Sequence, residues 1–190
     1  MGRIKYIVLT FLAVLFLVGC EKPKEVVTDN ESMEEFSLKV YQDISLNQQK
    51  ESNTIEFLTE ELGEPLIVNK YIGSSYAKWL IGNDERDMAV LEVHYKDDVP
   101  SQAMLTFTEP YEQPATKKEI KQKIETIPVG KKMYLDSLMT LFGVPRTLKK
   151  IHEKQGLREY CEFDHNIDQN TSVFIDMLDG KVEEIEEKNN

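Results

Sequence analysis

The side chains best suited to take part in a reaction are those of the three histidines and the two cysteines. His94 follows Glu92 at a spacing that places both side chains on one face of a strand. The chain contains no His-Glu-x-x-His, no Gly-x-Ser-x-Gly and no phosphate-binding glycine loop. We therefore expect a solvated polar face around His94 and no catalytic site. An enzyme that uses His94, His165 and neighbouring carboxylates stays as the alternative.

A run of oxygen-bearing side chains could bind a cation. These side chains alternate as the first ligands of a calcium loop do: Asp164, Asn166, Asp168 and Asn170. However, Gln169 occupies the position that needs glycine, and Ile175 occupies the position of the bidentate glutamate. We interpret this segment as a polar hairpin loop, and we predict neither a metal site nor a cofactor.

Cys20 is the residue with the most specific sequence context. Arg3 and Lys5 precede an apolar run, 7–18, which is too short for a membrane span of about 20 residues. The run ends in Leu-Val-Gly-Cys, which is typical of a bacterial lipobox whose cysteine receives a diacylglycerol thioether. We predict a signal peptide (1–19), a lipidated tether (20–31) and a palmitate-bearing lipoprotein on the outer side of the cell membrane, because two acyl chains anchor a protein stably.

Composition narrows the possible partners. The 190 residues include 34 acidic and 23 basic side chains, and the net charge is −11. The predicted signal peptide removes Arg3 and Lys5 and no acid, so the mature chain is more acidic still. This charge argues against nucleic acid as a partner. Cys161 is the only other cysteine, so we expect the domain to rely on packing and Cys161 to be a small buried hydrophobe.

The sequence of the first part of the domain, 32–108, predicts two helices and four strands. Ser32 and Glu35 have capping-box spacing, while Thr54 can cap a second helix that ends at Gly63 before Pro65. Alternating or apolar runs predict strands at 66–72, 76–81, 88–95 and 99–108. A Gly-Ser-Ser turn at 73–75 and a tight turn at 96–98 separate these strands.

The same order then begins again. Thr116 and Glu119 repeat the capping box, and a helix over 135–142 ends at Gly143. Strands are predicted at 146–153, 157–164, 172–178 and 181–187, with an Asp179-Gly180 hairpin turn. The predicted fold class is α+β: two tandem helix–helix–four-strand repeats (32–109 and 110–190), with the helices packed on one face of an antiparallel sheet.

The two repeats can be aligned by eye. Leu-Gly-Glu-Pro at 62–65 matches Phe-Gly-Val-Pro at 142–145, at an offset of 80 positions. From the second strand on, the offset is 82, which requires two extra residues in the second repeat's first hairpin. This alignment places Cys161 where Trp79 lies in the first repeat.

The helix-to-strand motif resembles that of the SmpA/OmlA (BamE-like) lipoprotein family and of the tandem β-lactamase-inhibitory-protein (BLIP-like) fold. The matching residues are Thr54, Leu58, Leu62, Gly63 and Pro65, and then Tyr134, Leu138, Phe142, Gly143 and Pro145. Ser52 and Lys132 depart from the pattern, since the family has glycine there, and Tyr134 replaces the capping threonine. The resemblance implies a fold, an envelope location and protein binding, and it does not transfer a β-lactamase partner.

Strand alternation divides the side chains into two faces. The set that contains Trp79 and Cys161 is apolar, so we expect the helices to cover it. The opposite set mixes charges with aromatic side chains and Met, which is the composition of interface cores. The residues predicted to form a binding face are Tyr76, Leu80, His94, Met104, Arg158, Tyr160 and Phe174, with Tyr76, Tyr160 and Phe174 as leading anchors.

Together these features favour a lipid-anchored, non-catalytic module that binds an envelope protein as an inhibitor, adaptor or assembly factor. Two other hypotheses stay open. One is the hydrolase or metal-dependent enzyme built on His94 and His165. The other is a small-ligand sensor or carrier, which needs a closed apolar cavity that we do not expect in a two-layer repeat sheet.

Overall fold

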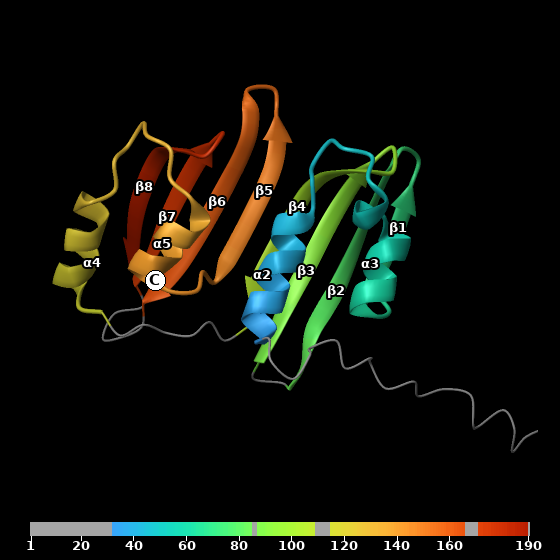
Figure 1. Cartoon of the computed structure of the whole chain (residues 1–190), viewed down its shortest axis with the longest axis horizontal. Coiled ribbons are helices and arrows are strands. Elements are labelled where there is room, and N and C mark those ends of the chain that lie inside the picture. The colour runs from blue at the N-terminus through green and yellow to red at the C-terminus, as the bar shows by residue number, and fades with distance from the viewer. Residues whose placement is uncertain (1–31, 85–86, 109–114, 166–170, 190) are drawn as a thin grey trace, which may run out of the picture.

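Four helices lie against one side of an eight-stranded antiparallel sheet in the part of the chain that the structure describes (Figure 1). This structure is a computed structural model, and it describes residues 32–84, 87–108, 115–165 and 171–189. The predicted signal peptide and tether lie outside these ranges. Within them, no helix is long and apolar enough to cross a membrane.

The helices begin and end close to where the sequence signals predict. They are α2 (Met33–Asp43), α3 (Ile55–Leu62), α4 (Lys117–Glu125) and α5 (Leu135–Phe142), with a short 3-10 turn at Glu51–Asn53. Both predicted capping boxes are confirmed: Glu35 N donates to Ser32 Oγ at 3.1 Å, and Glu119 N donates to Thr116 Oγ1 at 3.3 Å. Tyr134 precedes α5 without a side-chain cap, as its residue type suggests.

The strands follow one another in space in chain order. The first four are β1 (Ile67–Tyr71), β2 (Ser74–Asp84), β3 (Asp87–Lys96) and β4 (Val99–Phe107); the second four are β5 (Thr147–Glu153), β6 (Gly156–His165), β7 (Thr171–Leu178) and β8 (Lys181–Asn189). The predicted Gly-Ser-Ser turn is wrong by two residues. The turn is Ile72-Gly73, and both serines pair within β2, because Gly73 at φ 73° suffices to reverse the chain.

The two repeats differ more than the sequence alignment indicated. Leu66 N donates to the Lys78 carbonyl, and Arg146 N donates to the Glu162 carbonyl at the equivalent point of the second half. The hairpin of β5 and β6 is therefore four residues longer than that of β1 and β2, with two extra residues in each strand. The connection to the next strand is two residues shorter, since Trp79 pairs with Leu91 and Phe163 with Val173.

This difference in length corrects one predicted equivalence. By strand pairing, Phe163 occupies the position of Trp79, and Cys161 occupies that of Ala77. The offset between the repeats rises from 80 to 82 because a four-residue insertion in the hairpin is followed by a two-residue deletion in the next connection. A sequence alignment records only the net change. Cys161 is nevertheless buried, as predicted.

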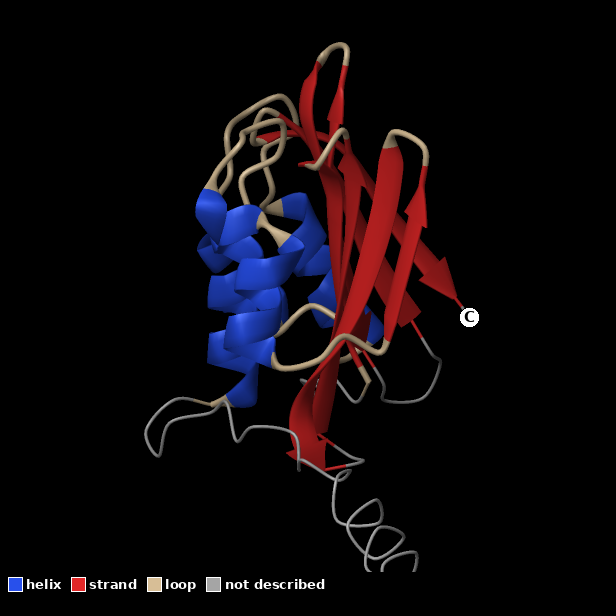
Figure 2. Ribbon diagram, turned by 90° about the vertical axis from the view of Figure 1, so that its right-hand side faces the viewer, coloured by secondary structure: helices blue, strands red, loops and turns tan. Residues whose placement is uncertain are grey.

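A direct strand pairing joins the two halves. β4 and β5 pair antiparallel from Gln102↔Ile151 to Thr106↔Thr147, so the eight strands make one sheet. The helices of both halves lie on the same side of that sheet (Figures 1 and 2). Between helices and sheet lies one continuous apolar core, which contains the whole inward-facing set predicted from alternation.

The glycine that ends α3 supplies the first prediction. Gly63 has φ 83° and no neighbouring atom within 4 Å of an added Cβ, so a substitution there strains the backbone without a clash. Gly63→Val should lower the free energy of unfolding by about 1 kcal/mol or more, because a β-branched residue disfavours positive φ. Gly143, at φ 88°, should respond in the same way. Urea unfolding measures the loss. Gly63→Asn should cost about as much as Gly63→Val, because ψ −174° places Gly63 in a region that essentially only glycine enters, outside the left-handed helical region that Asn tolerates. A clearly smaller cost for Asn would contradict the backbone explanation.

Candidate functional site

The face of the sheet opposite the helices carries no helix in the described part of the chain, and we call it the open face (Figure 2). Strand pairing places all seven predicted binding-face residues on it, in three adjacent cross-strand rows. The first row contains Tyr76, His94 and Arg158; the second contains Met104 and Tyr160; the third contains Leu80 and Phe174.

In the first half, His94 belongs to a polar network. Its Nε2 lies 2.7 Å from Glu92 Oε1, and Lys78 Nζ lies 2.9 Å from Glu92 Oε2. The imidazole stacks on Tyr76 with ring centroids 5.4 Å apart. Partial burial would raise the pKa of Glu92, but the hydrogen bonds from His94 and Lys78 outweigh it and keep this pKa below its usual value. These neighbours hold the His94 ring in place on a polar surface.

In the second half, Tyr160 and Phe174 lie on neighbouring strands beside a shallow hollow of about 300 Å³. Tyr160 is 37% exposed, so part of its ring is open to a partner. Each ring has a lysine ammonium over it: Lys149 Nζ is 5.7 Å from the Tyr160 centroid, and Lys188 Nζ is 4.5 Å from the Phe174 centroid. Sequence reasoning named the two rings but missed the two lysines.

Arg158 is held by its neighbours. Its Nη1 donates to Asp176 Oδ2 at 2.7 Å, and its Nε lies 3.3 Å from Glu153 Oε2. Asp176 Oδ1 is buried and has no hydrogen-bond partner among the described residues. Burial raises the pKa of Asp176, although the positive charge of Arg158 opposes the shift. Arg158 therefore stabilises a half-buried carboxylate and is less available to a partner than the sequence suggested.

The seven residues do not form one patch. Tyr76 lies on β2 and Tyr160 on β6, four strand spacings apart, which corresponds to about 19 Å at the usual spacing. Met104 lies between them on β4, and Leu80 and Phe174 occupy the neighbouring row. The open face thus offers two aromatic clusters, one in each half, connected by the central strands.

Reaction chemistry gains no geometric support in the described residues. No group of three or more His, Cys, Asp or Glu side chains there is arranged to hold a metal ion. The side chain of His165 and residues 166–170 of the segment interpreted as a polar hairpin loop lie outside the described part. Burial raises the pKa of the Cys161 thiol far above its usual value, so this cysteine is a poor nucleophile.

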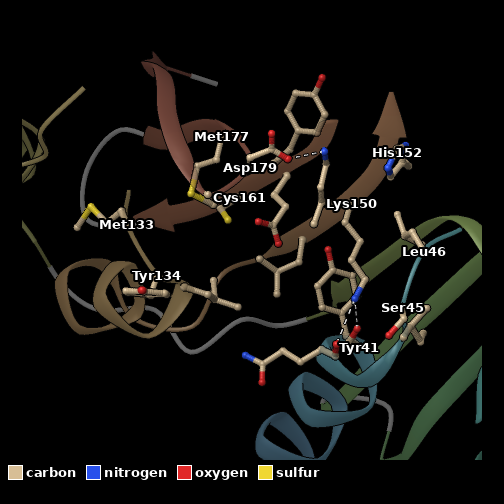
Figure 3. A pocket seen from close by; sticks show the side chains of 18 of the residues that line it. Tyr41, Ser45, Leu46, Met133, Tyr134, Lys150, His152, Cys161, Met177 and Asp179 are labelled. Atoms are coloured by element: carbon tan, nitrogen blue, oxygen red, sulfur yellow. Dashed lines mark hydrogen bonds between the residues drawn. The ribbon is translucent and has the colours of Figure 1, made fainter. Parts of the chain in front are cut away.

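The helix side contains a feature that sequence reasoning missed. An open cleft of about 650 Å³ separates α2 of the first half from the segment that leads into α5 of the second (Figure 3). Tyr41, Ser45 and Leu46 lie on one side of it, Met133 and Tyr134 on the other, and Lys150, Cys161 and Met177 on the sheet between them. We expected no closed apolar cavity, and this cleft is open; the repeat pattern does not reveal how far apart the helix pairs sit.

Lys150 is a buried charged residue of this cleft, and it connects the two halves. The residue is only 6% exposed. Its ammonium donates to the carbonyls of Tyr41 and Gln42 at the end of α2 and lies 4.5 Å from the centroid of the Tyr41 ring. Burial lowers the pKa of Lys150 to about 8, while Glu159, opposite it on β6, acts to raise it. The sequence signal that could have revealed this buried lysine is its position on β5, two residues after Leu148 and therefore on the same inward face.

Comparison with known proteins supports the fold and little else. No family model matches the chain, and no curated protein matches it in sequence. Among solved structures, the chain is similar to a Streptococcus mutans protein described as a candidate β-lactamase inhibitor protein. The TM-score is 0.55 at 12% sequence identity, and the match covers 85% of this chain and 98% of that one. The BLIP-like part of the predicted resemblance is confirmed at the level of the fold, whereas membership of the SmpA/OmlA family is not shown.

Proposed function

We propose that this chain is a non-catalytic protein-binding module, held at the outer side of the cell membrane by a lipid on Cys20. The observation that carries the proposal is the open face, a helix-free surface with an aromatic cluster in each half. Large aromatic side chains held on a rigid sheet bury much area at little cost in conformational entropy, which suits them to be binding anchors.

The fold adds support. It matches that of a solved protein described as a candidate inhibitor of β-lactamase, and such a protein acts by binding another protein. An inhibitor, an adaptor and an assembly factor would all use a surface of this kind. The acidic composition of the chain favours a partner with a neutral or basic contact surface.

A second candidate is a carrier of a small ligand, favoured by the cleft beside Lys150. A buried ammonium beside apolar walls could orient a polar group of such a ligand. This candidate differs from the first in the residues on which it depends. A ligand held in the cleft would not need Tyr76 or Phe174, which lie on the other side of the sheet, whereas Tyr160 is among the residues that line the cleft.

Alanine at the three predicted anchors tests the binding face. Tyr76→Ala, Tyr160→Ala and Phe174→Ala should each weaken partner capture at least severalfold while the protein stays folded, because the side chains are half-buried or exposed and lie outside the core. Capture is measured by crosslinking the anchored protein in its own cells and identifying the products by mass spectrometry.

Tyr134→Ala is the matched control, since Tyr134 is an exposed tyrosine (74%) on the helix side. It should leave capture unchanged. Undiminished capture by all three open-face variants, or equal loss with Tyr134→Ala, would remove the open face as the binding surface. Thermal unfolding of each variant shows whether a loss of capture reflects a loss of folding instead.

A further inference from the structure

The two outer strands of the sheet, β1 and β8, are protected very differently. Residues 66–72, which include β1, contain five of the eight large hydrophobic side chains that are exposed in the described structure. They are Leu66 (60% exposed), Ile67 (39%), Val68 (40%), Tyr71 (68%) and Ile72 (106%). α3 lies on the helix side near this end of the sheet (Figure 1), but the exposed fractions show that it leaves these side chains largely uncovered. Apolar side chains therefore project from both faces of β1, whose outer edge pairs with no strand among the described residues.

β8 shows the ordinary way of protecting an edge. Its four glutamates are Glu183, Glu184, Glu186 and Glu187. Such a run of like charges discourages another strand from pairing. Residues 66–72 contain no acid and a single charge, on Lys70. The contrast within one sheet indicates that the β1 edge is kept open for a strand.

The backbone of β1 has free groups in the right places. Tyr71 and Ser74 close a two-residue hairpin, so the alternation of antiparallel pairing directs the peptide groups of Asn69 toward β2. The same alternation turns the N–H and C=O groups of Val68 and Lys70 outward. An added strand would accept and donate hydrogen bonds at these two residues.

We propose that the occupant of this edge is a second copy of the chain, whose β1 pairs antiparallel with β1 about a two-fold axis at Asn69. The pattern is self-complementary in this register. Ile67 would lie opposite Tyr71 of the partner subunit, and Leu66 opposite Ile72 of the partner subunit. Val68 would exchange its outward hydrogen bonds with Lys70 of the partner subunit. The result is an isologous dimer with one sheet continuing through both copies.

Two arguments favour a second copy over another strand. Pairing β1 with β1 leaves no free β1 edge, so the assembly closes at two subunits, and the acidic β8 edges remain at its ends. The membrane tether proposed for Cys20 would also hold copies at one surface, which raises their effective concentration. The dimer does not use the open face, so its test is separate from that of the binding surface, while the argument from the tether rests on the anchor in the proposed function.

Disulfide crosslinking tests the pairing directly. In the proposed register the two Asn69 residues face each other as a non-hydrogen-bonded pair with Cα atoms about 4.5 Å apart, within disulfide range. Asn69→Cys in the full chain, oxidised in its own membrane, should give a covalent homodimer severalfold more abundant than the one from Glu184→Cys on the β8 edge. Lys70→Cys should also crosslink poorly, because two copies of this residue lie about 7–8 Å apart on the diagonal.

A proline substitution distinguishes crosslinking that needs strand pairing from crosslinking by random collision. Val68→Pro removes an outward N–H, which an edge strand tolerates in the fold but strand pairing requires. Added to Asn69→Cys, it should reduce the homodimer to the level of Glu184→Cys, while circular dichroism shows that the fold is kept. Homodimer no more abundant than in the Glu184→Cys control, or unaffected by Val68→Pro, would overturn the proposal. So would crosslinking of Asn69→Cys to a different protein, which would assign this edge to another partner's strand.

Discussion

A Cys20→Ser variant should carry no acyl chain, whereas wild-type protein should be fully lipidated. The reason is chemical, because a diacylglycerol thioether needs the Cys20 sulfur and a hydroxyl does not replace it. The physical consequence is large, since one acyl chain binds a membrane only marginally and two anchor it stably. Cells grown with an alkyne-bearing fatty acid provide the measurement: the label should disappear from Cys20→Ser and be present on the wild type.

The chain provides its own control for this experiment. Cys161 is the only other cysteine in the sequence, and it is buried in the core. Cys161→Ala should therefore keep the full label. Unlabelled wild-type protein, or a label that survives Cys20→Ser, would remove the proposed anchor and with it the proposed location. The open face would still be available to a partner in either case, so this result leaves the binding proposal to its own test.

Trp79→Ala should lower the free energy of unfolding by about 3–5 kcal/mol, the usual cost of emptying the site of a buried large aromatic side chain. Trp79 is completely buried, and it is the largest side chain buried to this degree in the described structure. It pairs with Leu91 in the centre of the first half's sheet, beneath the helices. Urea unfolding with an unchanged m-value measures the loss.

Two variants show that the loss arises from packing. Trp79→Phe should cost much less than Trp79→Ala, because it keeps an aromatic ring and removes an indole N–H that has no hydrogen-bond partner among the described residues. Tyr76→Ala, three positions away on the open face, should also cost clearly less. Comparable costs for Tyr76→Ala and Trp79→Ala would mean that the two faces of β2 are wrongly assigned.

The local signals in the sequence predicted the elements well. Ser32 with Glu35, and Thr116 with Glu119, begin their helices as expected, and Gly63 and Gly143 end theirs at positive φ. The Asp179-Gly180 turn, with φ values of 50° and 74°, is where the pattern placed it. Each of these features depends on backbone preferences within four or five residues, so the local sequence contains all the information that is needed.

The candidate site was only partly predictable. Alternation assigned Tyr76, Tyr160 and Phe174 to one face, because successive side chains of a strand must point to opposite sides. It could not show that Tyr160 and Phe174 are neighbours while Tyr76 lies four strands away. Nor could it show that Arg158 is held by Asp176 and Glu153. Those relations depend on register and strand order, which connect residues far apart in the chain.

The sequence by itself determined the two-fold repetition of elements, the faces of the strands and the caps and turns, since the backbone fixes these periods and dihedral angles locally. The tertiary structure alone decided that β4 pairs with β5, that one hairpin is four residues longer than its counterpart, and that a cleft separates the helix pairs around Lys150. These features are settled by packing between distant segments. Insertions and deletions compensate along the sequence, but every strand must find a physical neighbour in the sheet.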